Sequence, residues 1–263
     1  MSSEKSRGYF EFLANLGMTK HFGSMEATRK LVALCRIGSG QHVLDVGCGV
    51  GATPCYLAKA VDCQVVAVDL LEKMIEQSRE RAKVEGVQDR VEFTVADARN
   101  LPFEDDLFDA VIMESLNVFF EDKREAMSEY VRVTRPGGYV GITEMTWLRP
   151  PSPEAEEYFK RVVYADVLQA SDWTELLEEA GLREVVGSAH PVDIPQESKG
   201  RFERYGCRGL AKVMLKMLVV FLKDRGSREF LKDGTGGLSK DWIGDVGYGV
   251  FAGQKMNYRT TSC

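Results

Sequence analysis

The sequence predicts an α/β protein built on a doubly wound, mostly parallel sheet. Two observations predict this fold class. Short apolar runs of strand length alternate along the chain with longer segments whose apolar residues recur at helical spacing. A glycine-rich turn also follows the first of these runs and comes directly before a helix, as in βαβ units that bind a ligand.

The expected elements follow this alternation in order. Strands are predicted at residues 43–47, 65–69, 91–95, 109–114, 139–146, 183–190 and 248–254. Helices are predicted at residues 8–16, 24–36, 52–60, 72–85, 122–133, 154–164 and 173–180. Gly86 and Gly181 are placed to end two of these helices, and Ser171 or Asp172 to cap the last one. Pro136-Gly137-Gly138 is a strong turn signal before the fifth strand.

The turn itself carries three evenly spaced glycines, Gly47, Gly49 and Gly51, with Asp45 on the strand before them. Glycines allow close approach of a ligand and positive φ angles, and the N-terminus of the next helix favours an anionic group. The G-x-G-x-G spacing differs from the G-x-G-x-x-G of dinucleotide sites. A buried acid beside the turn would repel a pyrophosphate but suits an aminoacyl cofactor, which carries an ammonium group as well as a carboxylate.

Acidic residues also end the next three predicted strands, at Asp69, Asp97 and Glu114. In open parallel sheets, ligands bind at the carboxyl ends of the strands. Asp69 lies where an acid in a βαβ unit reaches ribose hydroxyls, although it could also cap the following helix. Asp97 could accept a hydrogen bond from an adenine amino group.

In these features the chain resembles the class I S-adenosylmethionine-dependent methyltransferases. The matching residues are the Asp45-to-Gly51 loop, Asp69, the Asp97-Ala98 pair and residues 135–138, and the resemblance covers residues 41–148 and the last strand near 248–255. It implies a Rossmann-like sheet of about seven strands whose last strand is antiparallel. It also implies S-adenosylmethionine as cofactor and S-adenosylhomocysteine as product.

The resemblance further implies which residues contact the cofactor. These are Asp45, Gly47, Cys48, Gly49, Gly51, Asp69, Leu70, Met74, Asp97, Ala98 and Glu114. The glycine loop would face the methionine end, and Asp45 and the Glu114 backbone would lie near its amino group. Asp69 would hold the ribose, Leu70 would lie against the adenine, and Asp97 with Ala98 would contact the adenine edge.

The length of 263 residues suits one α/β domain with an insertion. We expect an N-terminal helical flap at 1–36, a core at 37–192 and 248–256, and a helical cap insertion at 193–247. The net charge of −6 disfavours nucleic acid as a partner. The six cysteines show no zinc-like spacing, so no metal site is expected. Without an apolar signal segment or membrane-spanning run, a cytoplasmic protein is predicted.

The insertion differs in charge from the rest of the chain. Between Lys199 and Arg225 lie eight Lys or Arg residues and two Asp or Glu residues. Its apolar residues at helical spacing are Leu210, Val213, Met214, Met217, Leu218 and Phe221. One interpretation is a cap helix that packs this face over the mouth of the site. The other is that it receives an anionic or lipid-like substrate or touches a membrane surface. A dimer is also compatible with the sequence.

Methyl transfer needs alignment of the two reactants, and a base only for some nucleophiles. The candidate residues on the acceptor side are His21, Glu114, Asn117 and Glu144. Each also has a structural interpretation, such as a helix cap or an ion pair. The segment after strand four, residues 114–117, lacks the Asn/Asp-Pro-Pro-aromatic pattern of nucleic-acid amino methyltransferases, which favours a small-molecule acceptor.

The family likeness includes quinone and sterol methyltransferases. Two alternatives remain open from the sequence. One is a nicotinamide-dependent oxidoreductase, against which the glycine spacing argues. The other is a non-catalytic module that binds S-adenosylmethionine.

Overall fold

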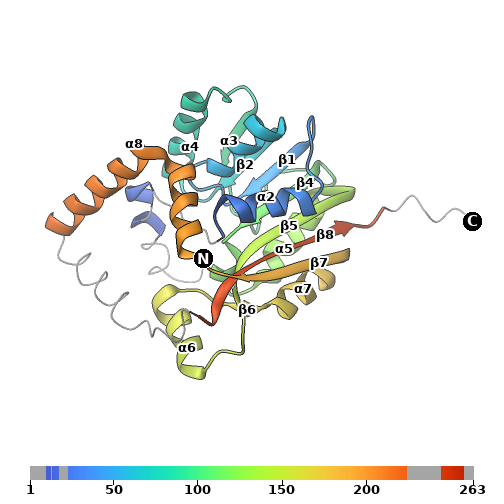
Figure 1. Cartoon of the computed structure of the whole chain (residues 1–263). Helices are drawn as coiled ribbons and strands as arrows, with labels where there is room; N and C mark the ends of the chain where they lie inside the picture. The colour runs from blue at the N-terminus through green and yellow to red at the C-terminus, as the bar shows by residue number, and fades with distance from the viewer. Residues whose placement is uncertain (1–9, 13, 18–22, 224–243, 258–263) are drawn as a thin grey trace, which may run out of the picture.

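The computed structural model describes residues 10–12, 14–17, 23–223 and 244–257 (Figure 1). Its centre is an eight-stranded sheet in the order β3-β2-β1-β4-β5-β8-β7, with β6 paired to β5 at the side. The strands are β1 His42–Val46, β2 Gln64–Asp69, β3 Val91–Val95, β4 Phe108–Glu114, β5 Thr134–Trp147, β6 Leu168–Gln169, β7 Leu182–Pro191 and β8 Val246–Lys255. The predicted α/β class and mostly parallel sheet are confirmed.

The direction of each strand follows the expected pattern. Strands β1 to β5 pair in parallel, while β8 is antiparallel to both of its neighbours, β5 and β7. The antiparallel last strand is therefore confirmed. The strand order reverses between β1 and β4, which is the switch point where ligands bind in doubly wound sheets.

Helices cover both faces of the sheet (Figure 1). The helices with described bounds are α2 Ser24–Leu34, α3 Ala52–Tyr56, α4 Glu72–Glu85, α5 Lys123–Val133, α6 Pro153–Tyr158, α7 Ala170–Glu179 and α8 Ile194–Lys223. Residues 10–12 and 14–16, in the predicted helix 8–16, are also helical. Short turns of other helix types extend α3 over Leu57–Val61 and α6 over Phe159–Val163, and a 3-10 turn, η2, spans Asn117–Phe119. Apolar residues of α2, α3 and α4 pack on one face, and those of α5, α6 and α7 on the other.

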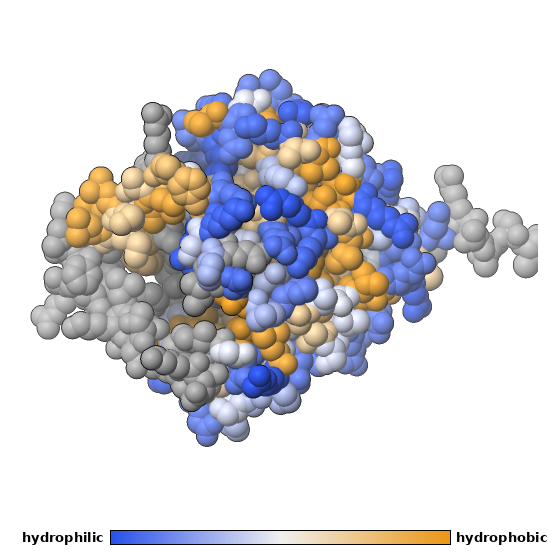
Figure 2. Space-filling model, in the orientation of Figure 1, coloured by the Kyte–Doolittle hydropathy of each residue, from blue (hydrophilic) through white to orange (hydrophobic). Residues whose placement is uncertain are grey.

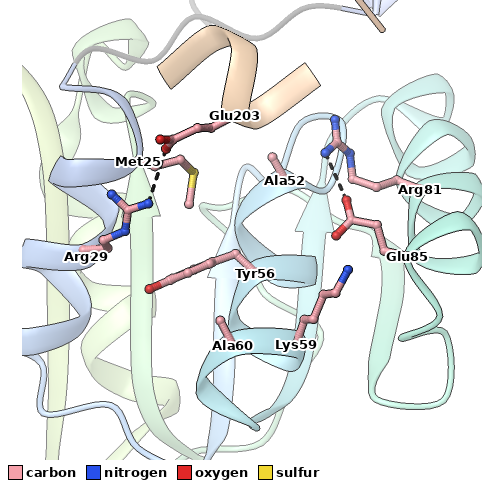
Figure 3. A pocket seen from close by; sticks show the side chains of 9 residues that line it. All are labelled: Met25, Arg29, Ala52, Tyr56, Lys59, Ala60, Arg81, Glu85 and Glu203. Atoms are coloured by element: carbon pink, nitrogen blue, oxygen red, sulfur yellow. Dashed lines mark hydrogen bonds and ion pairs between the residues drawn. The ribbon is translucent and has the colours of Figure 1, made fainter. Parts of the chain in front are cut away.

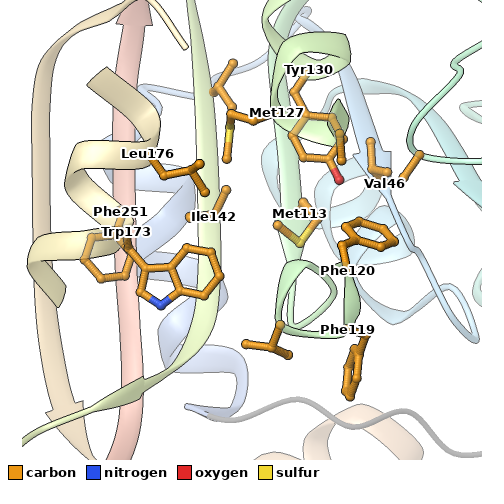
Figure 4. Packing of buried hydrophobic residues seen from close by; sticks show 14 of the residues in the cluster. Val46, Met113, Phe119, Phe120, Met127, Tyr130, Ile142, Trp173, Leu176 and Phe251 are labelled. Carbon is orange, nitrogen blue, oxygen red and sulfur yellow. The ribbon is translucent and has the colours of Figure 1, made fainter. Parts of the chain in front are cut away.

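Burial on both faces explains the near-continuous apolar runs of the central strands. On the α5–α7 side, Trp173 and Phe251 pack beside Ile142, and Tyr130 of α5 lies above Met113 (Figure 4). Trp173 is completely buried, and its indole N–H donates to the Met145 carbonyl oxygen at 3.3 Å. The packed core on this side includes Met113 near the end of β4 and Met145 near the end of β5.

Two local predictions are wrong. Pro136-Gly137-Gly138 does not form a separate turn but lies inside β5, where a register shift against β4 takes up the extra residues and Gly137 has a φ of 79°. Helix α7 starts earlier than expected. Gln169 is its N-cap, and Asp172 completes a capping box three residues later instead of capping the helix itself. Both segments pair with neighbouring strands, residues 134–147 with β4 and β8 and Gln169 with β5. A local sequence pattern does not reveal such pairing.

Helix α8 is the described part of the predicted insertion. It is kinked at Gly206, whose φ of 62° is non-helical. Its first half packs on α2: the Gly23 N–H donates to a Glu197 carboxylate oxygen at 2.6 Å, and Arg29 pairs with Glu203 at 3.3 Å. In the described residues, no helix has both the length and the apolar character needed to cross a bilayer.

The second half of α8 does not pack as the cap interpretation requires. Of the apolar residues predicted to face the site, Val213 is buried, but Met214 is 71% exposed and Leu218 is 54% exposed. Figure 2 shows apolar residues gathered on the projecting part of this helix. The side chain of Phe221 lies outside the described residues. The predicted helix is thus confirmed, while the predicted packing of Met214 and Leu218 is not.

Candidate functional site

The glycine turn lies between β1 and α3, at the carboxyl edge of the sheet. Gly47, Gly49 and Gly51 all have positive φ angles, of 75°, 55° and 75°. The N–H groups of Gly47 and Cys48 donate to the Val68 carbonyl oxygen at 2.8 and 2.9 Å, which ties the turn to β2. The positive φ values explain why glycine occupies all three positions.

Neighbouring side chains fill the space around two of these glycines. A Cβ atom on Gly47 would lie 2.8 Å from Leu116 Cδ2, and one on Gly51 would lie 2.9 Å from Ser78. The Ser78 hydroxyl also donates to the Gly49 carbonyl oxygen at 2.8 Å. Any side chain here would displace a neighbour, so the turn has a fixed shape with its backbone closely packed.

Asp69, at the end of β2, links the turn to the next helix. One carboxylate oxygen accepts the Gly49 N–H at 2.9 Å, and the other accepts the Leu71 N–H at 3.0 Å. Leu71, not Asp69, is the N-cap of α4. Burial raises the pKa of Asp69 to about 6, against the lowering effect of these backbone donors. Asp69 is therefore a partly buried carboxylate with remaining acceptor capacity beside the glycine turn.

The other predicted cofactor residues lie around the same edge. Leu70, next to Asp69, is 42% exposed, so its side chain is open for a ring to lie on it. Met74 and Ala98 are buried, and the Asp97 carboxylate forms an ion pair with Arg99 at 2.6 Å. Hydrogen bonds from Arg99 hold the pKa of Asp97 below its ordinary value.

Asp45 and Cys48 are both buried at the turn. Burial, with the nearby acids Asp69 and Asp45, holds the pKa of the Cys48 thiol well above its ordinary value. The neutral thiol is a poor nucleophile and behaves as a small packing residue. Cys48 thus shapes the turn and supplies no reactive group.

Glu114, at the end of β4, is held from two helices. One carboxylate oxygen accepts the Thr28 hydroxyl of α2 at 2.7 Å, and the other accepts the Thr53 hydroxyl of α3 at 2.5 Å. Glu114 therefore joins the N-terminal helix to the helix that follows the glycine turn. The sequence pattern did not identify either threonine, because the three residues are far apart along the chain.

Glu144 and Asn117 are completely buried. The Glu144 Oε1 atom accepts the backbone N–H groups of Leu116 at 3.0 Å and Asn117 at 2.6 Å. Desolvation raises the pKa of Glu144 to about 7. The Asn117 Oδ1 atom accepts the Tyr130 hydroxyl at 3.2 Å. His21, the fourth residue predicted on the acceptor side, lies outside the described residues.

A cavity of about 300 Å³ lies apart from the predicted cofactor residues, between α2, α3, α4 and α8 (Figure 3). Arg29, Lys59, Arg81 and Tyr56 line it together with Glu85 and Glu203. Two of the cations are paired across or beside it, Arg29 with Glu203 and Arg81 with Glu85, each at 3.3 Å. None of the residues predicted to contact the cofactor lines this cavity.

Comparison with known proteins shows that the part of the chain containing this site is similar to methyltransferases. Residues 44–142 match the family described as "Methyltransferase domain". Phosphoethanolamine N-methyltransferase 1 of Arabidopsis thaliana is 30% identical over 220 residues, which are 78% of this chain and 44% of the plant protein. The chain therefore spans less than half the length of this curated relative.

Solved structures share the fold across nearly the whole chain. A structure titled as the [4+2]-cyclase SpnF has a TM-score of 0.73 at 19% identity, covering 95% of this chain and 94% of its own. A methyltransferase from Thiobacillus denitrificans, solved in complex with S-adenosylhomocysteine, has a TM-score of 0.68 at 20% identity, covering 92% and 96%. At these identities the likeness shows the fold alone.

Proposed function

The chain belongs to the class I S-adenosylmethionine-dependent methyltransferase family, and we propose that it transfers a methyl group from S-adenosylmethionine to a small molecule. The observation that carries the proposal is the glycine turn at Gly47–Gly51, bonded to Asp69 through the Gly49 N–H and packed closely enough at Gly47 and Gly51 that a Cβ would meet Leu116 or Ser78. This turn lies at the switch point of the sheet, where the fold binds ligands.

The residues around the turn fit this cofactor. Asp69 would accept hydrogen bonds from the ribose hydroxyls, since its carboxylate oxygens each hold one backbone N–H and have capacity left. The exposed Leu70 would lie against the adenine, and Asp97 and Ala98 would contact its edge. Asp45 would lie near the amino group of the methionine end.

When bound, S-adenosylmethionine would supply a methyl group on a sulfonium, and an acceptor lone pair would bond to the methyl carbon in line as the C–S bond breaks and S-adenosylhomocysteine leaves. The work of the protein is to align the acceptor and to exclude water. We propose His21 as the general base for an acceptor that must lose a proton. Glu114 and Glu144 are less suited to this role, because two threonine hydroxyls engage the first and two backbone N–H groups the second.

Calorimetric titration with S-adenosylmethionine, S-adenosylhomocysteine and NADH tests the cofactor. We expect the first two to bind and NADH not to bind. Binding of NADH alone would contradict the proposal and favour an oxidoreductase.

Formation of S-adenosylhomocysteine on addition of acceptors then tests for transfer. Phosphoethanolamine, named for the Arabidopsis relative, is the first acceptor to test, followed by quinones and sterols. We expect acceptor-dependent product. Cofactor binding with no product from any acceptor would favour a non-catalytic module that binds S-adenosylmethionine.

We also propose that the second half of α8, residues 207–223, contacts an anionic lipid surface from the cytoplasmic side. The exposed apolar side chains on it are Met214, Leu215, Met217, Leu218 and Val219, with exposed fractions of 71%, 62%, 39%, 54% and 41%. The sequence of the surrounding segment is strongly basic within an acidic chain. An amphipathic helix with a basic polar side binds anionic lipid through burial of its apolar side chains and through attraction of its basic side chains to the headgroups.

Co-sedimentation with phosphatidylglycerol vesicles tests this contact. We expect binding that weakens with added salt and that is lost in Leu215→Asp/Leu218→Asp. The matched control is Val84→Asp, which changes a 78% exposed apolar residue of α4 and should bind as the wild type does. Loss of a dimer in the double variant, with no vesicle binding by the wild type, would show that a second copy covers this surface instead.

A further inference from the structure

The segment from Ser115 to Asn117 follows β4 and is bonded to β5 at three successive residues. The Ser115 N–H donates to the Thr143 carbonyl oxygen at 2.6 Å. The next two N–H groups, of Leu116 and Asn117, both donate to Glu144 Oε1, at 3.0 and 2.6 Å. One side chain therefore holds two of the three N–H groups of this segment.

The segment has a backbone conformation that needs this support. Ser115 has a φ of 58°, in the left-handed region that a residue with a side chain rarely adopts. Such a conformation persists only where the surroundings fix it, and it is often found at functional sites. The bonds to Thr143 and Glu144 lie directly on either side of this residue and supply that constraint.

A buried carboxylate such as Glu144 is an energetically costly group with which to constrain this segment. Its side chain is completely buried, and desolvation disfavours the charged form. Its Oε2 atom is buried with no hydrogen-bond partner among the described residues. One carboxylate oxygen therefore accepts the backbone N–H groups of residues 116 and 117, and the Glu144 side chain has no solvent-exposed surface.

The middle residue of the segment lies against the glycine turn. Leu116 Cδ2 would be 2.8 Å from a Cβ atom on Gly47, so the leucine side chain covers the first glycine of the turn. Leu116 is itself partly buried against the core on the α5–α7 side. A chain of direct contacts thus runs from Glu144, through the backbone N–H of Leu116, to Gly47.

We propose that Glu144 is a positioning residue that fixes Leu116 against Gly47 and so sets the wall of the cofactor site at its methionine end. The proposal rests on the proposed function, because it assumes that the glycine turn holds S-adenosylmethionine. Glu144 was predicted from the sequence to lie on the acceptor side, but a fully buried carboxylate is poorly placed to contact the methyl acceptor.

The test is a double-mutant cycle on affinity for S-adenosylhomocysteine, measured by calorimetry, with melting temperature recorded for every variant. Glu144→Leu removes the acceptor, and we expect at least tenfold weaker binding. Glu144→Gln keeps an oxygen that can accept both N–H groups and should bind within threefold of the wild type. Leu116→Ala removes the contact with Gly47, together with the packing of this side chain on the core, and should weaken binding three- to tenfold.

The double variant Glu144→Leu/Leu116→Ala distinguishes positioning from independent effects. Because both changes act through the placement of Leu116, we expect it to bind no more than threefold worse than Glu144→Leu alone. Fully multiplicative losses would overturn the proposal. So would a Glu144→Leu protein with a lower melting temperature but unchanged affinity, which is the result of a purely structural role.

Leu116→Ala keeps the proposal falsifiable if Glu144→Leu does not fold, since unchanged affinity in that variant would also overturn it. A wild-type protein that binds no S-adenosylhomocysteine is a different result. It would refute the proposed function, not the role of Glu144 in holding the segment.

Discussion

Replacing Asp69 by alanine is expected to weaken cofactor binding strongly. Each carboxylate oxygen of Asp69 holds a backbone N–H, that of Gly49 or Leu71, and would also accept from the ribose. Hydrogen bonds to a charged group contribute about 1.5–3 kcal/mol. The expected loss is therefore about 10- to 150-fold in the dissociation constant of S-adenosylhomocysteine.

The assay is calorimetric titration of S-adenosylhomocysteine into both proteins at pH 5 and pH 8. Since the pKa of Asp69 is about 6, the wild type should bind more weakly at pH 5, where the acceptor is protonated, and Asp69→Ala should lose this dependence. Asp89→Ala, at an exposed acid outside the site, is the matched control. Equal affinity of Asp69→Ala and wild type would show that Asp69 does not bind the ribose and only accepts the backbone N–H groups of Gly49 and Leu71.

Two further predictions concern stability, measured by urea unfolding. Gly51→Ala should cost more than Gly86→Ala: both glycines have positive φ, but only at position 51 does the new Cβ meet Ser78, which adds about 1–3 kcal/mol of overpacking. Equal losses would show that Ser78 moves aside freely. Burial raises the pKa of Glu144 from 4.5 to about 7, despite the nearby Lys123. The stability that the protonated Glu144 gives the wild type is therefore lost as pH rises through 7. Glu144→Gln has no such loss, so its free energy of unfolding relative to wild type should rise by about 2–3 kcal/mol between pH 5 and pH 8. A difference that stays constant with pH would show that the carboxyl group titrates normally.

Local patterns were sufficient to predict the central sheet. The runs at 43–47, 65–69 and 109–114 are apolar because helices bury both faces of those strands, and each lies within one residue of the strand in the structure. The glycine turn was predictable for a similar reason, since three positive φ angles leave little choice of residue.

Contacts between distant segments were not predictable in this way. Glu114 was identified at a strand end, but its partners Thr28 and Thr53 lie 86 and 61 residues away along the chain. Glu144 was assigned to the acceptor side because it is acidic and near a strand end. Its side chain is instead completely buried and bonded to the segment after β4, and no single-sequence pattern encodes that packing.

The apolar residues of α8 show what helical spacing does not predict. Helical spacing correctly predicted the helix, but spacing does not say what an apolar face packs against. Met214 and Leu218 are exposed in the structure, so the same periodicity that suggested a cap over the site now supports contact with another surface.

The central claim is that the turn at Gly47–Gly51 holds the methyl donor. A crystal structure of the chain with S-adenosylhomocysteine tests it most directly. We expect the ribose hydroxyls on the Asp69 carboxylate, the adenine beside Leu70 and the methionine end along the glycine turn. Ligand found instead in the cavity lined by Arg29 and Lys59, with the turn empty, would show that the glycine turn does not hold the methyl donor.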